Sequence, residues 1–268
     1  MHQIDIDELK LKQLEILQYV DQFCQENDID YFLDGGTLLG AIRHKGYIPW
    51  DDDLDIGLLR KDYNKLLAIF NQKNRNTNYE LIGSEINNSY PYIYSKIIDK
   101  KTILYEPDEK ALKLSVNIDV FPYDDIPVNI KDLKVLYRKR SLYTTLSQLQ
   151  YGAIYPDSIL KKLIISVAQI ILAFFPRGFF ARKMICSIKQ HCKNNQSGYV
   201  SDFTGTVSFK CDKQAFDSYV MKEFEGKMFK VPERYDLLLT AIYGDYMKLP
   251  PVEERVSHHR FIAFSYND

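Results

Sequence analysis

The chain of 268 residues carries 35 lysines and arginines against 36 aspartates and glutamates, and 46% of its residues are hydrophobic. This length suits one large globular domain or a catalytic domain with a helical appendage, and it is enough to bury a sizeable core. The balanced charge indicates no nucleic-acid partner, and four cysteines without a C-x-x-C pair favour free thiols in a reducing cytoplasm.

The N-terminal stretch "MHQIDIDELK" is acidic and polar, whereas a signal peptide needs a basic start and an apolar middle. Nothing in this stretch would export the protein, so we expect a cytoplasmic location. Leu9, Leu14 and Leu17 belong to an apolar face with helical spacing. This pattern predicts an amphipathic helix over residues 5–26.

A strand, a turn and a helix are predicted next. Residues 29–36, "IDYFLDGG", favour a short strand that runs into a Gly-Gly turn. The stretch "TLLGAIRHKG", residues 37–46, predicts a helix with Thr37 as its N-cap and Gly46 just past its end. Residues 53–59, "DLDIGLL", alternate between polar and apolar and predict a second strand. A further helix is predicted over residues 61–72, and further strands over 79–85, 92–99 and 116–123.

Residues 130–193 are rich in Leu, Ile and Lys and are predicted to be mostly helical. Their longest apolar run, residues 163–175, is too short to span a membrane, and Pro176 follows it. A buried helix is therefore the expectation. As an alternative, lysines and arginines on both sides of the run allow it to rest on a membrane surface. The basic flanks are Lys161, Lys162, Arg177, Arg182 and Lys183.

The last part of the chain returns to mixed structure, with its clearest helix in "PERYDLLLTAIYG". Strands therefore stand before and after a helical insert, and this order of elements predicts an α+β (mixed α/β) fold. We divide the chain into an N-terminal helix, a catalytic core, a helical insert, and a C-terminal part that completes the catalytic domain. These parts cover residues 1–27, 28–129, 130–195 and 196–268.

A cluster of aspartates lies in "WDDDLDIGLL" beside residues that normally go inside. Because successive side chains of a strand point to opposite faces, Asp53 and Asp55 would share one face, while Leu54 and Ile56 would pack inward from the other. Asp51 and Asp52 lie at the entry to the strand, where a loop is an equal alternative, and on the strand Asp52 would point away from Asp53. Clustered carboxylates repel one another, so this arrangement indicates that something positive belongs there.

Asp119 is a further candidate, because it interrupts the apolar strand "VNIDVFP". Carboxylates on adjacent strands form a site for hard divalent cations, and such cations often bridge protein carboxylates to substrate phosphates. We therefore predict Mg²⁺, with Mn²⁺ as a second candidate, held by Asp53, Asp55 and Asp119. The alternative is a solvated acidic turn that Lys45 or Arg60 neutralises.

The Gly35-Gly36 turn is a separate signal. Backbone approaches a ligand closely at glycine, and helix N-termini favour phosphate. An ordinary tight turn is the alternative, and the Gly-Gly pair by itself would favour it. The combination of this turn with an Asp-x-Asp pattern on the next strand favours a phosphate site.

This combination resembles the nucleotidyltransferase superfold. More narrowly, "DGGTLLGAIRHKGYIPWDDDLDIGLLRKDY", residues 34–63, is similar to the signature of the LicD family. That family includes bacterial phosphorylcholine transferases and is related to fukutin-type ribitol-phosphate transferases. Weaker similarity continues in "SKIIDKKTIL", "NIDVFPYD", "FEGKMFKVPERYDLLLTAIYGDYMKLPP" and the late "HH". The resemblance implies a nucleotidyltransferase-like sheet with flanking helices in the catalytic core.

The resemblance also implies an activity: metal-dependent transfer of a phosphorylated alcohol from a CDP-alcohol to a sugar hydroxyl of a bacterial surface glycan, with release of CMP. CDP-choline is the favoured donor, and the acceptor is expected to be polymeric or lipid-linked. Asp53, Asp55 and Asp119 would be the catalytic metal carboxylates. The expected donor-binding residues are Gly35, Gly36, Thr37, Arg43, Lys96, His258 and His259. For Lys96 a solvent-facing position is an equal alternative, and for the histidines a surface tail.

Three other functions stay open at this point. A nucleotidyltransferase acting on a small molecule shares the Gly-Gly and Asp-x-Asp pattern, but it should lack "GAIRHKGYIPWDDD". A glycosyltransferase would need a nucleotide-binding domain of the Rossmann type before the acid pair, and none is visible. A non-catalytic carbohydrate-binding protein has no need for three metal carboxylates.

Overall fold

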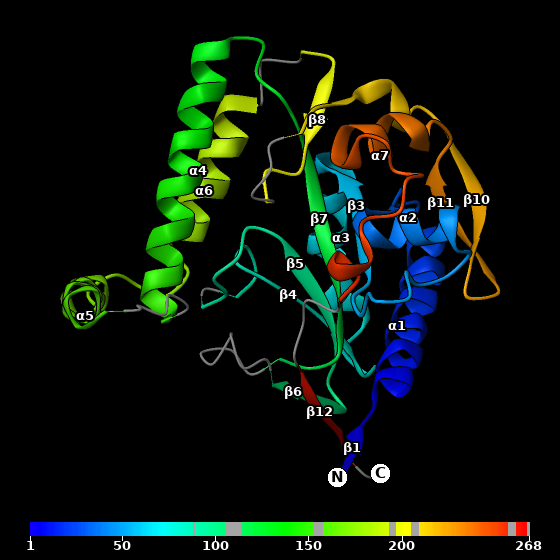
Figure 1. Cartoon of the computed structure of the whole chain (residues 1–268), viewed down its shortest axis with the longest axis horizontal. Coiled ribbons are helices and arrows are strands. Elements are labelled where there is room, and N and C mark those ends of the chain that lie inside the picture. The colour runs from blue at the N-terminus through cyan, green and yellow to red at the C-terminus, as the bar shows by residue number, and fades with distance from the viewer. Residues whose placement is uncertain are drawn as a thin grey trace.

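The computed structural model describes residues 1–87, 89–105, 114–152, 158–192, 197–204, 209–256 and 261–266. Its helices are α1 (Ile6–Glu26), α2 (Gly35–Arg43), α3 (Arg60–Lys73), α4 (Ile130–Tyr151), α5 (Ile159–Leu172), α6 (Phe179–Cys192) and α7 (Tyr235–Tyr243). Its strands are β1 (His2–Ile4), β2 (Phe32–Leu33), β3 (Asp55–Leu59), β4 (Tyr79–Gly83), β5 (Ser95–Asp99), β6 (Thr102–Tyr105), β7 (Asn117–Asp125), β8 (Tyr199–Ser201), β9 (Cys211–Asp212), β10 (Tyr219–Phe224), β11 (Lys227–Pro232) and β12 (Ile262–Ser265). The α+β prediction is confirmed (Figure 1).

The largest sheet runs in the order β2-β3-β7-β5-β4, and β8 and β9 extend it from β7. Strands β3 and β7 are parallel, and the other neighbours in this order are antiparallel. A Cβ atom added at Gly57 on β3 would lie 2.3 Å from the ring of Phe32. Gly57 therefore allows two aromatic rings, Phe32 and Tyr123, to pack directly on the sheet backbone.

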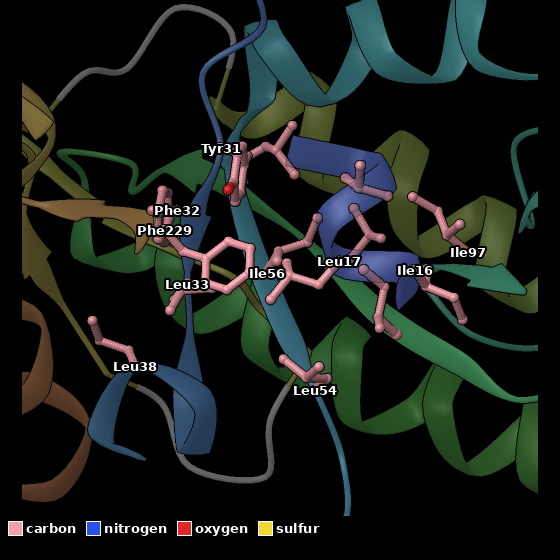
Figure 2. Close-up of a cluster of buried hydrophobic side chains, with 14 of the residues drawn as sticks. Ile16, Leu17, Tyr31, Phe32, Leu33, Leu38, Leu54, Ile56, Ile97 and Phe229 are labelled. Atoms are coloured by element: carbon pink, nitrogen blue, oxygen red, sulfur yellow. The ribbon is translucent and has the colours of Figure 1, made fainter. Parts of the chain in front are cut away.

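Helix α1 covers one face of this sheet and confirms the amphipathic helix predicted over residues 5–26. Its N-cap is Asp5, whose side chain accepts the backbone N–H of Glu8 at 2.9 Å. Ile16 and Leu17 are fully buried. Figure 2 shows them directed toward Ile56 and Ile97 of the sheet. Burying this apolar stripe fixes the sheet against α1, and thereby fixes the strands that carry the aspartates.

Helix α2 begins three residues earlier than the sequence indicates. Its N-cap is Asp34, whose carboxylate accepts the backbone N–H of Gly35 at 2.8 Å, so the prediction of Thr37 as N-cap is wrong. Thr37 is buried inside the helix, and its hydroxyl accepts the backbone N–H of Asp55 at 2.8 Å. Both Asp34 and Thr37 are residue types that cap helices well, and the sequence alone did not distinguish them.

The stretch that was predicted to be helical contains α4, α5 and α6. Helices α4 and α6 pack side by side and share a second hydrophobic cluster with Phe203, which is centred on Leu136, Met184 and Ile188. Helix α5 lies crosswise at the far end of this pair, away from β10 and β11 (Figure 1). The four-part division of the chain stays a prediction.

The expected buried helix over residues 163–175 is wrong. Of the α5 side chains that the structure describes, only that of Leu172 is buried. The apolar residues of this run instead face solvent, and the structure therefore leaves the membrane-surface alternative standing. Within the described ranges, no helix is both long enough and apolar enough to cross a membrane.

Candidate functional site

Asp55 and Asp119 face each other across the two parallel strands at the centre of the sheet. They are register partners in the β3–β7 ladder, so their side chains project from the same face. Burial raises the pKa of Asp55 well above the ordinary range, and the charges of Asp53 and Asp119 raise it further. Two of the three predicted carboxylates are therefore brought together by strand pairing, as the sequence indicates.

Asp53 lies before β3 rather than on it, because the strand begins at Asp55. Burial nevertheless alternates from residue 53 to residue 56, with Leu54 and Ile56 buried and both aspartates half-buried. That Asp53 and Asp55 share one face stays a prediction. Asp53 lines a cavity of about 120 Å³ together with Asp52 and Asp119. Asp52 is buried beside the same cavity, and its backbone oxygen accepts a hydrogen bond from Gln13 at 3.1 Å. The expectation that Asp52 points away from Asp53 stays a prediction.

Lys96 forms an ion pair with Asp119, one of these two carboxylates. It is the register partner of Asp119 in the β5–β7 ladder, and its Nζ lies 2.5 Å from Oδ1 of Asp119 and 3.1 Å from Oδ1 of Asn117. Lys96 is only 7% exposed, so the solvent-facing alternative is wrong. A buried lysine paired with a carboxylate supplies one positive charge beside the point where a phosphate would bind.

The Gly-Gly turn packs against the aspartates. Gly35 has φ = +52°, in the left-handed region, and a Cβ atom added there would lie 2.8 Å from Oδ2 of Asp55. A Cβ atom at Gly36 would lie 2.5 Å from Oδ2 of Asp51. No larger residue fits at either position without moving a carboxylate, which explains the two glycines. Binding of phosphate at this turn stays a prediction. Asp51 lies against the turn, and its signal in the sequence was its place in the run of aspartates.

Asp34 is a second residue that the sequence analysis missed. It is 3% exposed, caps α2, and accepts a hydrogen bond from the hydroxyl of Tyr123 at 2.7 Å. Burial raises the pKa of Asp34 to about 7, against the lowering effect of the Tyr123 hydrogen bond. Asp34 holds the N-terminus of α2 against β7, and its signal in the sequence was its position directly before Gly35.

A larger cavity of about 530 Å³ opens on the other side of the Gly-Gly turn. Gly36 and Asp51 line it, with Trp50, Tyr243 and Arg43. The Nη1 atom of Arg43 donates to the backbone oxygen of Tyr246 at 2.9 Å, and burial lowers the pKa of the guanidinium. Arg43 therefore lines the same cavity as Gly36, together with aromatic side chains, and its role in donor binding stays a prediction.

The predicted residues thus divide into three groups. Asp55, Asp119 and Lys96 lie together on the sheet, and Asp53 lies beside them in the same cavity. Gly35, Gly36 and Thr37 form the adjoining helix start, with Arg43 in the neighbouring cavity. His258 and His259 lie outside the described residues.

The donor atoms at Asp55 and Asp119 are carboxylate oxygens, the ligand type that Mg²⁺ and Mn²⁺ prefer. No group of three or more His, Cys, Asp or Glu side chains is arranged to hold an ion in the part of the chain that the structure describes. At Asp119 the lysine ammonium provides the positive charge instead. Binding of a metal by Asp53, Asp55 and Asp119 therefore stays a prediction, in which Asp119 exchanges its lysine partner for an ion.

If these carboxylates bind a divalent cation, millimolar Mg²⁺ should raise the melting temperature of the purified chain and EDTA should reverse the rise. An ion at a hundred times its dissociation constant stabilises the native state by about 2.7 kcal/mol. Protons compete for Asp55 because its pKa is raised, so the shift should shrink in mildly acidic buffer. Differential scanning fluorimetry on the wild type and Asp55→Asn tests this. An equal shift in both proteins would place the ion elsewhere.

Comparison with known proteins adds a second kind of evidence. Residues 28–150 match the family model described as LicD/FKTN/FKRP, nucleotidyltransferase domain. The chain is 33% identical over 264 residues to the lipopolysaccharide cholinephosphotransferase LicD of Haemophilus influenzae, and the match covers 97% of each chain. The similarity therefore includes the helical insert and the C-terminal part as well as the aspartate sites.

Other proteins are similar to shorter segments of the chain. An uncharacterized protein of Rickettsia prowazekii is 39% identical over 90 residues, which is 34% of this chain and 30% of that protein. The human ribitol 5-phosphate transferase FKRP is 44% identical over 48 residues, which is 18% of this chain and 10% of that protein. These proteins are related to the chain over limited segments only.

Proposed function

Because the chain belongs to the LicD family and is an enzyme, a LicD-type phosphotransferase, we propose that it transfers phosphocholine from CDP-choline to a sugar hydroxyl of a surface glycan. One observation carries this proposal. The relative that matches 97% of the chain is named a lipopolysaccharide cholinephosphotransferase. The facing carboxylates and the glycine turn supply a site of the kind that phosphoryl transfer needs.

In the proposed reaction the oxygen of the sugar hydroxyl attacks the phosphorus that carries choline. A new P–O bond forms, the P–O bond to CMP breaks, and CMP leaves with the electron pair. A divalent cation held by Asp53, Asp55 and Asp119 would supply charge neutralisation at the donor phosphates. Asp119 would accept the hydroxyl proton. The N–H groups of the α2 N-terminus at Gly35 and Gly36 would bind phosphate oxygens.

The cavity beside the turn offers room for the donor. Its aromatic lining includes Trp50, Tyr243 and Tyr246, and ring faces attract quaternary ammonium groups. The guanidinium of Arg255 already lies 5.7 Å from the centre of the Trp50 ring. This contact supports the view that the ring attracts cations, and we propose that the choline group binds in this cavity.

A donor screen tests the proposal directly. Purified full-length chain with lipopolysaccharide as acceptor should release CMP fastest from CDP-choline, more slowly from CDP-ribitol and CDP-glycerol, and not from CTP. Ribitol phosphate is the second candidate cargo because of the FKRP match. Turnover of CDP-ribitol without turnover of CDP-choline would overturn the choice of alcohol. Release of pyrophosphate from CTP would instead favour a nucleotidyltransferase.

We propose that the reaction takes place in the cytoplasm, where CDP-alcohols occur.

A further inference from the structure

Helix α5 carries a continuous stripe of exposed apolar side chains. The spacing of the stripe is helical, at steps of three and four residues, so its members share one face of α5 and the turn after it. Its members, with the exposed fraction of each, are Leu160 (68%), Leu163 (64%), Ile164 (60%), Val167 (51%), Ile170 (65%), Ile171 (57%) and Phe174 (87%). We call this set the α5 stripe.

The α5 stripe is not the face through which α5 packs on the rest of the protein. Leu172 is buried on the opposite face, where α5 contacts α4 and where Gln150 of α4 donates to the backbone oxygen of Leu172 at 3.2 Å. Figure 1 shows α5 at an extreme of the molecule, beyond the α4–α6 pair. Large apolar side chains that gather on one face at such a position mark an interaction surface rather than scattered exposure.

The charge around the stripe indicates what covers it. Residues 130–195 contain twelve lysines and arginines and two aspartates, although the whole chain is close to neutral. Lys161 and Lys162 are exposed in the first turns of α5, and Arg177 and Lys183 are exposed shortly after the stripe. Between Ser158 and Ser201 the sequence contains no acidic residue. An apolar face with basic flanks is complementary to an anionic lipid surface.

We propose that the α5 stripe docks the chain onto the surface of an anionic lipid bilayer. The helix would lie in the plane of the interface, with Phe174 and the aliphatic side chains at the boundary between headgroups and acyl chains and the lysines at the headgroups. Its 14 residues are too few to span the bilayer, which agrees with surface docking. This proposal stands independently of the choice of donor.

A second copy of the chain fits the surface less well. Two stripes packed face to face would bring two strongly basic inserts together, and like charges at that distance repel. A bilayer containing phosphatidylglycerol supplies both the apolar phase and the negative charge. The lipid surface is therefore the occupant to which we commit.

The test is co-sedimentation of the full-length chain with vesicles of phosphatidylcholine, with and without phosphatidylglycerol. The wild type should sediment with the anionic vesicles. The variant Leu163→Ser/Val167→Ser/Phe174→Ser should bind the anionic vesicles at least about tenfold more weakly than the wild type. The variant Lys161→Glu/Lys162→Glu should also bind more weakly, and its loss of affinity should be larger on vesicles that contain more phosphatidylglycerol. The variant Lys227→Glu/Met228→Ser changes an exposed lysine and an exposed methionine on β11, and should bind as the wild type does.

Three outcomes would overturn the proposal: no sedimentation of the wild type, equal binding by the stripe variant, or a wild-type dimer in light scattering that the stripe variant converts to monomer without any vesicle binding. Circular dichroism and thermal unfolding show whether each variant is folded. The stripe is exposed, so native melting temperatures are expected for all of them. CMP release from CDP-choline with a soluble acceptor should be unchanged in the stripe variant, which separates this proposal from that of the reaction.

Discussion

Asp55→Asn should lower the rate of CMP release by at least about a hundredfold, the scale on which one electrostatic contact to a transition state is lost. The change keeps the size of the side chain and removes its charge. Burial raises the pKa of Asp55, and repulsion by Asp53 and Asp119 raises it further. The free protein should therefore keep its stability or gain slightly, while it loses a ligand for the ion and the phosphates.

Asp119→Asn should cause a similar loss of turnover but a different change in stability. Its carboxylate pairs with the buried Lys96, so removal of the charge leaves an ammonium with a weaker partner. We expect a cost of about 1–3 kcal/mol in the free energy of unfolding. Asp125→Asn is the matched control, because it lies on the same strand and also loses a lysine pair, with Lys213 at 2.7 Å, but does not line the cavity.

Asp53→Asn should resemble Asp55→Asn in turnover, and Asp52→Asn should be milder. Asp53 is the charge that raises the pKa of Asp55 most, after burial, whereas Asp52 is not among the charges that do so. These predictions are tested by steady-state CMP release and thermal unfolding of the wild type and the five Asp→Asn variants, at positions 52, 53, 55, 119 and 125. Near-normal turnover in Asp55→Asn or Asp119→Asn, or full activity in EDTA, would show that these carboxylates are not the catalytic metal site.

Gly35→Ala should reduce turnover by about a hundredfold while the chain remains folded, because a methyl group there would lie 2.8 Å from Oδ2 of Asp55 and displace the carboxylate. The left-handed backbone of Gly35 also adds strain of about 1–2 kcal/mol for any residue with a Cβ atom. Strain alone would lower stability, whereas displacement of Asp55 would lower the rate of the reaction.

Gly226→Ala separates these two effects. Gly226 has φ = +71° in the hairpin between β10 and β11, and a Cβ atom there would meet nothing within 4 Å. Both variants should lose similar stability in chemical denaturation, and only Gly35→Ala should lose turnover. Equal turnover in the two variants would show that the glycine turn does not position the carboxylate.

The pairing of Asp55 with Asp119 was predictable because two strands of the same sheet carried an aspartate in an apolar setting. The first residue of the strand was not, because β3 begins at Asp55, where its pairing with β7 begins, and Asp53 therefore lies before the strand. Propensity likewise did not decide between Asp34 and Thr37 as N-cap of α2. The hydrogen bond from Tyr123 to Asp34 joins residues 89 positions apart in the sequence.

The exposure of α5 could not be predicted from its composition either. An apolar run of residues 163–175 is equally suitable for a protein interior and for a lipid surface, since both exclude water. In the structure α4 packs against α6, and the α5 stripe remains exposed. The flanking lysines and arginines were the part of the sequence that kept the membrane-surface alternative open.

Positive and negative charges are unevenly distributed along the chain, although its isoelectric point of about 6.5 indicates a nearly neutral protein. Residues 130–195 carry a surplus of ten positive charges by formal count, and the remainder of the chain carries the opposing negative surplus. A negatively charged surface attracts the first part and repels the second, so it exerts a torque on the molecule within about a Debye length, ~10 Å. The chain would be turned with its helical insert foremost before any side chain touches the surface.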